Sequence, residues 1–159
     1  MERGGFDEWV AAAAPRLHRS AFLLVGDWAL AQDLVQHACA STWSRWLSVD
    51  APDAYAQAVM ARTASSWWRR RWRSEVPTDL LPEGGSDPWG DVDRREAVSR
   101  ALRALPPRQR AVVVLRFFDD FTEAQAAEAL GWPIGTVKST TARALSALRA
   151  TELAEETLR

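Results

Sequence analysis

The chain of 159 residues has a single cysteine, Cys39, and therefore forms no internal disulfide. A lone thiol is typical of proteins kept in a reducing compartment such as the cytoplasm. Cys39 and the two histidines, His18 and His37, are too few soft ligands for a zinc site. We therefore expect neither a disulfide-stabilised secreted protein nor a metalloprotein, and we expect no cofactor.

Long apolar runs are also missing. No stretch approaches the roughly 18 consecutive apolar residues that a membrane-spanning helix needs. The N-terminus carries the acids Glu2, Asp7 and Glu8 instead of a basic start followed by an apolar segment. We expect no membrane insertion and a cytoplasmic location.

The common signatures of enzyme chemistry are absent from the sequence. It contains no Gly-rich phosphate loop and no His-Glu-x-x-His pair, and Cys39 has no evident base beside it. We therefore predict a protein that acts by binding and not by catalysis.

Charge is unevenly distributed, although the net charge is only −1. Residues 1–74 carry a net charge of +2 and residues 93–149 one of +4, whereas residues 75–92 hold five acids and no base. Three prolines and three glycines in 75–92 favour an acidic flexible linker between domains at 1–74 and 93–159. The linker either acts as a plain tether or shields the basic domains with its acidic side chains. The positive charge of these domains favours binding to a polyanion such as nucleic acid.

Helical periodicity dominates both flanking segments, which predicts an all-α protein of two small domains. Helices are expected over residues 6–25, 28–46 and 53–73, with a kink or new start at Pro15 and a cap at Asp27. Their predicted inner stripes are Phe6, Val10, Ala13, Leu17, Ala21 and Leu24; Ala31, Val35, Ala38, Thr42 and Trp46; and Tyr55, Val59, Thr63 and Trp67. Beyond the linker, Val112, Leu115 and Phe118 give a further helix its apolar side.

The last third of the chain has the layout of a helix-turn-helix. Thr122 and Gln125 have the spacing of a capping box, which predicts a short helix over 123–130. Gly131 suits a left-handed helix end, and a second helix is expected over 134–150. This arrangement places the second helix in the major groove of DNA.

The outer face of that second helix is predicted to bind DNA. Hydroxyls and cations suit phosphate oxygens and base edges, and acids are absent from 129–151. A helical hairpin with a merely solvated polar face is the alternative. The predicted contacts are Thr136, Lys138, Ser139, Thr140 and Arg143.

A second cationic cluster lies in residues 62–73, which hold five arginines, three tryptophans and no acid. Arginines bind phosphates, and aromatic rings stack on unpaired bases, so this segment suits duplex and opened DNA. Trp67, on the apolar stripe, is instead expected in the core. The candidate DNA contacts are Arg62, Trp68, Arg69, Arg70, Arg71 and Arg73.

The sequence resembles bacterial RNA polymerase sigma factors, most of all the extracytoplasmic-function group. The resemblance to region 4 is carried by residues 105–110 (LPPRQR), 113–117 (VVLRF), 126–131 (AAEALG) and 133–139 (PIGTVKS). The resemblance to region 2 is carried by residues 21–27 (AFLLVGD), 31–36 (AQDLVQ) and 66–71 (SWWRRR).

This resemblance implies a division of roles along the chain. Residues 93–150 would bind the −35 promoter element as duplex, and the helix from Asp53 to Arg73 would read and melt the −10 element. The loop from Leu47 to Asp53 would hold a flipped base of the melted −10 strand. The clamp helices of core RNA polymerase would contact Gln32, Asp33 and Gln36.

The sequence departs from the family where Thr140 and Thr141 replace the usual Arg and Leu. Thr140 removes a long cation, and Thr141 brings a hydroxyl that needs a partner to an inner position. The family also makes an anti-sigma protein an expected further partner. A stand-alone helix-turn-helix regulator and a degenerate sigma-like protein that sequesters a partner remain alternatives.

Overall fold

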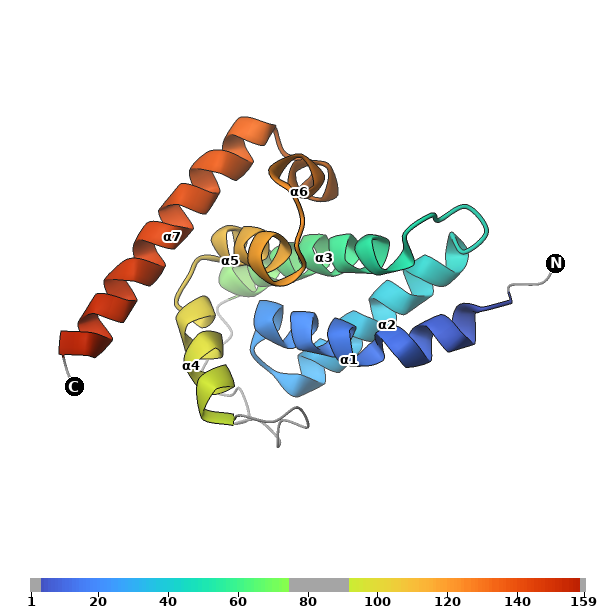
Figure 1. The fold of residues 1–159 in the computed structure, drawn as a ribbon, viewed down its shortest axis with the longest axis horizontal. Coiled ribbons are helices and arrows are strands. Elements are labelled where there is room, and N and C mark those ends of the chain that lie inside the picture. The colour runs from blue at the N-terminus through green and yellow to red at the C-terminus, as the bar shows by residue number, and fades with distance from the viewer. Residues whose placement is uncertain (1–3, 75–91, 158–159) are drawn as a thin grey trace.

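The computed structural model describes residues 4–74 and 92–157, and within them the side chains of residues 4–66 and 96–151. The regular elements of these residues are all helical, as the sequence predicts (Figure 1). They are α1 (Phe6–Val25), α2 (Trp28–Ser44), α3 (Pro52–Ser74), α4 (Val92–Arg103), α5 (Pro107–Val113), the π-helix η2 (Val114–Phe118), α6 (Glu123–Leu130) and α7 (Ile134–Thr157). The predicted linker falls mostly outside the described residues.

Helices α1 and α2 follow most of the predicted pattern, but Phe6, Val10 and Trp46 are only half-buried, and α2 ends at Ser44, before Trp46. Ala13, Leu17, Ala21 and Leu24 are buried in α1, and Ala31, Val35, Ala38 and Thr42 are buried in α2. Gly26 ends α1 with φ +72°, and the Asp27 side chain accepts a hydrogen bond from the Leu30 N–H, as expected for a helix cap. Of the predicted kink or new start at Pro15, the new start is wrong, because α1 continues through the proline, which is exposed to solvent.

The buried side of α3 differs from the predicted stripe. Val59 is buried as expected, but Tyr55 and Thr63 are only half-buried, and the other buried positions include Ala56, Met60 and Ala64. The reason is that α3 is covered twice, by α1 and α2 and also by α5 and α6. A helix covered on two sides needs several small residues, because bulky ones would hold its neighbours apart.

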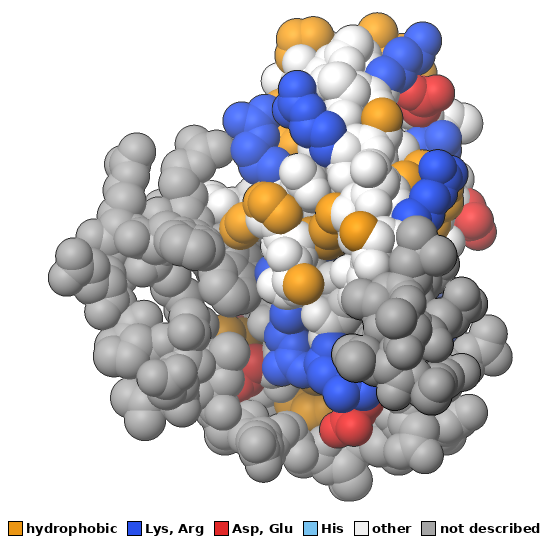
Figure 2. Space-filling model, turned by 90° about the vertical axis from the view of Figure 1, so that its left-hand side faces the viewer, with side chains coloured by type: hydrophobic (Ala, Val, Ile, Leu, Met, Phe, Trp, Pro, Cys, Tyr) orange, Lys and Arg blue, Asp and Glu red, His pale blue; other side chains and the backbone are white. Residues whose placement is uncertain are grey.

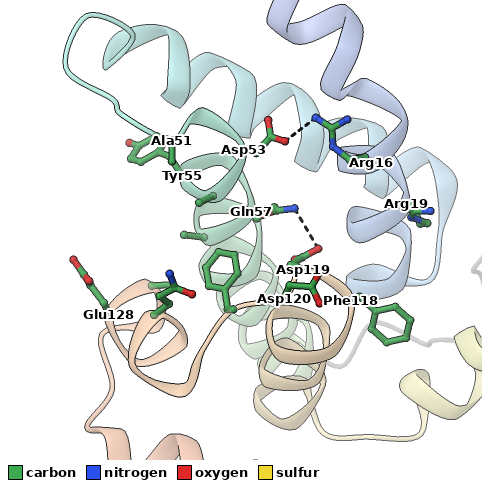
Figure 3. Close-up of a pocket in the computed structure, with 15 residues that line it drawn as sticks. Arg16, Arg19, Ala51, Asp53, Tyr55, Gln57, Phe118, Asp119, Asp120 and Glu128 are labelled. Atoms are coloured by element: carbon green, nitrogen blue, oxygen red, sulfur yellow. Dashed lines mark hydrogen bonds and ion pairs between the residues drawn. The ribbon is translucent and has the colours of Figure 1, made fainter.

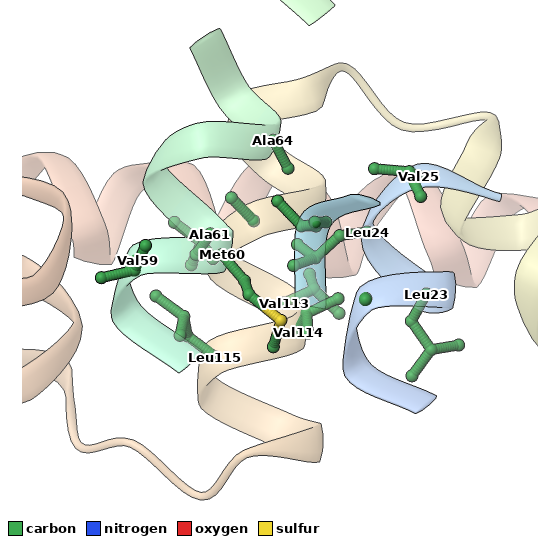
Figure 4. Packing of buried hydrophobic residues seen from close by; sticks show 14 of the residues in the cluster. Leu23, Leu24, Val25, Val59, Met60, Ala61, Ala64, Val113, Val114 and Leu115 are labelled. Carbon is green, nitrogen blue, oxygen red and sulfur yellow. The ribbon is translucent and has the colours of Figure 1, made fainter. Parts of the chain in front are cut away.

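The two halves of the chain share one hydrophobic core. Figure 4 shows Met60 of α3 pointing toward Val113 and Val114, which lie at the junction of α5 and η2. All three side chains are buried. Helix α1 also contacts α4, α5 and η2. The predicted domain boundaries remain a prediction, but the halves they separate pack directly against each other.

A π-helical turn ends the α5 segment and changes its register. The N–H of Asp119 donates to the carbonyl of Val114 at 2.9 Å, a five-residue spacing that rotates the chain relative to an α-helix. The predicted inner position of Phe118 is therefore wrong: its side chain is 44% exposed. Phe121 is buried beyond this turn.

A buried arginine connects several backbone segments. Arg110, only 3% exposed, donates hydrogen bonds to the carbonyls of Leu102, Arg103 and Leu105, and across the two halves to that of Leu24. Burial, with a smaller contribution from the charge of Arg103, lowers the pKa of Arg110 to about 10. The guanidinium therefore remains charged at neutral pH and satisfies carbonyls at the helix ends.

We predict that Arg110→Met lowers the free energy of unfolding by about 3 kcal/mol, because buried carbonyls lose their donors. Urea denaturation followed by circular dichroism measures the change. Arg100→Met, at an exposed position of α4, is the control and should cost less than about 1 kcal/mol. Equal losses in the two variants would contradict this account of Arg110.

Candidate nucleic-acid interface

Helices α6 and α7 form the predicted helix-turn-helix. The Thr122 hydroxyl accepts from the Gln125 N–H at 3.1 Å, and the Gln125 side chain accepts from the Thr122 N–H at 2.9 Å, which confirms the capping box. Gly131 ends α6 with φ +70°, a conformation that glycine adopts without strain. These local contacts fix the direction in which α7 leaves the turn.

One side of α7 presents cations and hydroxyls to solvent. Lys138, Ser139 and Arg143 are exposed, and Thr136 is half-buried. Figure 2 looks onto the side of the molecule that α7 occupies, and Lys and Arg side chains recur along it. The surface has the chemistry that phosphate oxygens and base edges require.

Thr140 does not belong to this surface, and its predicted outward position is wrong. Its side chain is 7% exposed, because Thr140 lies three residues after Val137 and four before Ala144, both fully buried. Thr141 is half-buried, and its hydroxyl donates to the Val137 carbonyl at 2.7 Å. The hydroxyl partner that the sequence required at Thr141 is thus a backbone carbonyl of the same helix.

Helix α2 carries the second predicted contact surface. Gln32, Asp33 and Gln36 are all exposed and lie on the side of α2 opposite the buried Leu34 and Ala38. Gln36 lies four residues after Gln32 and three after Asp33, so it shares a helix face with both of them. The structure therefore gathers the three predicted polymerase contacts into one polar, acid-bearing surface.

The cationic end of α3 is described only in part. Arg62 is exposed on α3, which continues to Ser74. The predicted contacts Trp68, Arg69, Arg70, Arg71 and Arg73, and the predicted core position of Trp67, concern side chains outside the described residues.

An aromatic cluster supports the loop between α2 and α3. The rings of Phe6, Trp9, Trp43 and Trp46 pack with centroid distances of 4.9–5.7 Å. Leu47, the first residue of the predicted base-binding loop, follows directly and is 57% exposed. The sequence did not indicate this aromatic cluster.

A polar network fixes the start of α3 to α1. Asp53, in the first turn of α3, accepts hydrogen bonds from Trp9 Nε1 and from Arg16 Nη2, each at 2.6 Å. The Arg16–Asp53 ion pair is about half-exposed, so its own contribution is small. Together the contacts hold the end of the predicted base-binding loop in place.

Comparison with known proteins gives matches over both halves of the chain. Residues 9–74 match the family described as Sigma-70 region 2, and residues 95–148 match the family described as Sigma-70, region 4. The chain belongs to the sigma-70 family. The family predicted from the motifs is thus confirmed, and the chain is an RNA polymerase sigma factor that directs transcription initiation at promoters.

Similar proteins span most of this sigma factor. The RNA polymerase sigma-E factor of Streptomyces coelicolor is 43% identical over 151 residues, covering 91% of this chain and 84% of the relative. The RNA polymerase sigma factor SigV of Bacillus subtilis is 31% identical, covering 83% and 81% of the two chains.

Two solved structures have a similar fold. The sigma factor RpoE of Bartonella quintana, in complex with the anti-sigma factor NepR, matches with a TM-score of 0.70 and 25% identity, covering 91% of this chain and 94% of its own. CnrH, in complex with the cytosolic domain of CnrY, matches with a TM-score of 0.66 and 21% identity, covering 94% and 88%, and shows similarity of fold alone.

We predict that Asp53→Ala destabilises the chain by about 1–2 kcal/mol, because Trp9 Nε1 loses its acceptor and α3 loses an acid in its first turn. Asp53→Asn retains an acceptor for Trp9 and should lose less than half as much. Asp50→Ala, at an exposed position of the same loop, is the control. Urea denaturation compares the three, and no difference between Asp53→Ala and Asp50→Ala would refute the anchoring role.

Proposed function

We propose that this sigma factor reads the −35 element with the exposed face of α7. The observation that carries this assignment is the position of Lys138, Ser139 and Arg143, which lie together on the solvent side of a helix held by the α6 capping box and the Gly131 turn. Thr136, half-buried at the start of α7, is a fourth contact. Thr140 acts through packing inside the domain and not through DNA.

The polymerase contact and the −10 contact lie in the first half of the chain. The exposed polar face of α2, formed by Gln32, Asp33 and Gln36, contacts the clamp helices of core RNA polymerase. The cationic end of α3 contacts the −10 element, beginning with the exposed Arg62. The loop that begins at Leu47 receives an unstacked base of the melted strand, beside the aromatic cluster.

The protein acts by binding alone and forms or breaks no bond. Burial raises the pKa of the Cys39 thiol and keeps it protonated, which is unfavourable for a nucleophile. Among the described residues no three His, Cys, Asp or Glu side chains are placed to hold a metal ion, and no helix is long and apolar enough to cross a bilayer. We assign the protein to the cytoplasm, where it meets polymerase and DNA.

An anti-sigma protein is a further proposed partner. One similar solved structure, that of the sigma factor RpoE, is a complex with the anti-sigma factor NepR. In this chain a cavity of about 720 Å³ opens between the two halves, lined by residues of α1, α3, η2 and α6 (Figure 3). A partner segment seated there would contact both halves at once.

Run-off transcription with core RNA polymerase on a promoter library tests the proposal. Transcripts from templates that share a −35 and a −10 motif are the expected result. Duplex binding without association with core polymerase would instead favour a stand-alone regulator. Association with polymerase without transcripts would favour a sequestering protein.

We predict that Lys138→Ala and Arg143→Ala each weaken binding of duplex −35 DNA several-fold, because each removes a cation from the exposed face of α7. For each variant that loses a phosphate contact, the slope of log K against log salt should fall by about 0.9. Fluorescence anisotropy at several salt concentrations measures both quantities. Thr140→Val, at the buried position, is the control and should change the affinity less than about twofold.

We predict that Asp33→Ala weakens the affinity for core RNA polymerase about tenfold, because it removes the central charge of the exposed α2 face. Affinity for −35 duplex should not change. Glu8→Ala, at an exposed acid of α1, is the matched control for charge. Biolayer interferometry with immobilised polymerase measures the affinity, and equal binding by the two variants would exclude the α2 face.

A further inference from the structure

Lys138 is the only lysine in the chain, which holds 19 arginines. An arginine guanidinium stays protonated in proteins and is therefore a very poor nucleophile. A lysine amine exists in part without its proton, and in that form it attacks electrophilic carbon. Reagents that modify side-chain amines therefore have one target in this sequence, and that target lies on α7.

The side chain of Lys138 is accessible to a small reagent. It is exposed, and its neighbours about one turn before and after it on α7 are Gly135 and Ala142, which are also exposed. A Cβ added at Gly135 would meet nothing within 4 Å, so this side of α7 is open. Within the described part of the chain, no residue forms an ion pair or a hydrogen bond with the Lys138 ammonium. Neither crowding nor a bound carboxylate protects the amine.

The surroundings of Lys138 indicate the class of reagent that suits it. Residues 134–150 contain no carboxylate and no histidine, so this part of α7 provides no general base beside the amine. The donor must therefore carry its own activation. An acyl phosphate, the mixed anhydride of a carboxylic acid and phosphoric acid, has phosphate as its leaving group. Its negative charge is attracted by residues 93–149, whose net charge is +4.

We propose that Lys138 is an acylation site and that its modification by an acyl phosphate switches off binding to the −35 element. In this step the unprotonated amine attacks the carbonyl carbon of the donor, and an N–C bond forms. The C–O bond to phosphate breaks, and phosphate leaves with the electron pair. One proton passes from the nitrogen to the departing phosphate. The sigma factor is the substrate of this step and not its catalyst.

Acylation changes the chemistry of the exposed face of α7. It converts the ammonium of Lys138, which lies on this face with Ser139 and Arg143, into a neutral amide. The modified side chain loses its attraction for phosphate oxygens and adds volume to the surface that meets DNA. This consequence rests on the proposed role of α7 in reading the −35 element. The acylation itself rests only on the uniqueness and the exposure of Lys138.

The modification leaves the other two proposed contact surfaces unchanged. The polymerase contacts on α2 are Gln32, Asp33 and Gln36, and the −10 segment, residues 62–73, holds five arginines and no lysine. Neither surface has a side-chain amine that the donor can modify. The acylated protein therefore binds core polymerase but not −35 DNA, and it occupies polymerase without directing it to promoters that require the −35 contact.

Incubation of the full chain with acetyl phosphate tests the proposal, with acetyl-coenzyme A at the same concentration as the thioester arm. Peptide mass spectrometry should find the acetyl group at Lys138, and ion exchange separates the modified protein. Fluorescence anisotropy should show about tenfold weaker binding of −35 duplex, with the slope of log K against log salt lower by about 0.9. Affinity for core polymerase, measured by biolayer interferometry, should change less than about twofold.

Three variants separate the amine from its position and its charge. Untreated Lys138→Gln should bind −35 duplex as weakly as the acetylated protein, because its side chain is also neutral. Lys138→Arg retains a positive charge but cannot be acylated, so treatment should not change its own affinity. The double variant with Lys138→Arg and Arg100→Lys moves the single amine to an exposed position of α4, where acetylation should not weaken DNA binding.

Treated protein without an acetyl group at Lys138, or modification by the thioester alone, would overturn the proposal. So would acetylated protein that binds −35 duplex as the unmodified protein does, or that also loses core polymerase. Circular dichroism of each protein confirms that it is folded. Unmodified protein that fails to bind −35 duplex, although Lys138 is acetylated on treatment, would instead refute the proposed function of α7 and leave the acylation site standing.

Discussion

The double burial of α3 is the constraint on which the rest of the structure depends. Its small and flexible side chains, Ala56, Met60 and Ala64, allow α1 and α2 to pack on one side and α5 and α6 on the other. Both DNA-reading halves therefore share one helix as a common support. Because packing at this density tolerates little change in volume, the orientation of one half is coupled to that of the other.

Local signals in the sequence were sufficient for most helix boundaries and caps. Gly26-Asp27 and the Thr122–Gln125 pair act through contacts a few residues apart, so their geometry follows from spacing alone. The motif matches also predicted the family and the exposed faces of α2 and α7. The polymerase and DNA contacts assigned to those faces remain proposals.

Long-range contacts account for what the sequence did not show. The buried face of α3 differs from the predicted stripe because a second layer of helices covers α3. The periodicity of residues 53–73 contains no information about packing against α5. Thr140 was misplaced because it shares a face with Val137 and Ala144, whose burial depends on the helices that α7 packs against. The hydrogen-bond donors to the Asp119 carboxylate, Ser20 and Gln57, lie 99 and 62 residues away along the chain, beyond the reach of any local pattern.

The π-helical turn links backbone register to surface character. One additional residue in the turn between Val114 and Phe118 directs Phe118 outward and brings Asp119 against α1 and α3. If the same segment wound as a regular α-helix, Phe118 would take the place of Asp119 against α1 and α3, and this part of the junction between the halves would become apolar. The polarity of the contact between the two halves thus depends on the winding of a single helical turn.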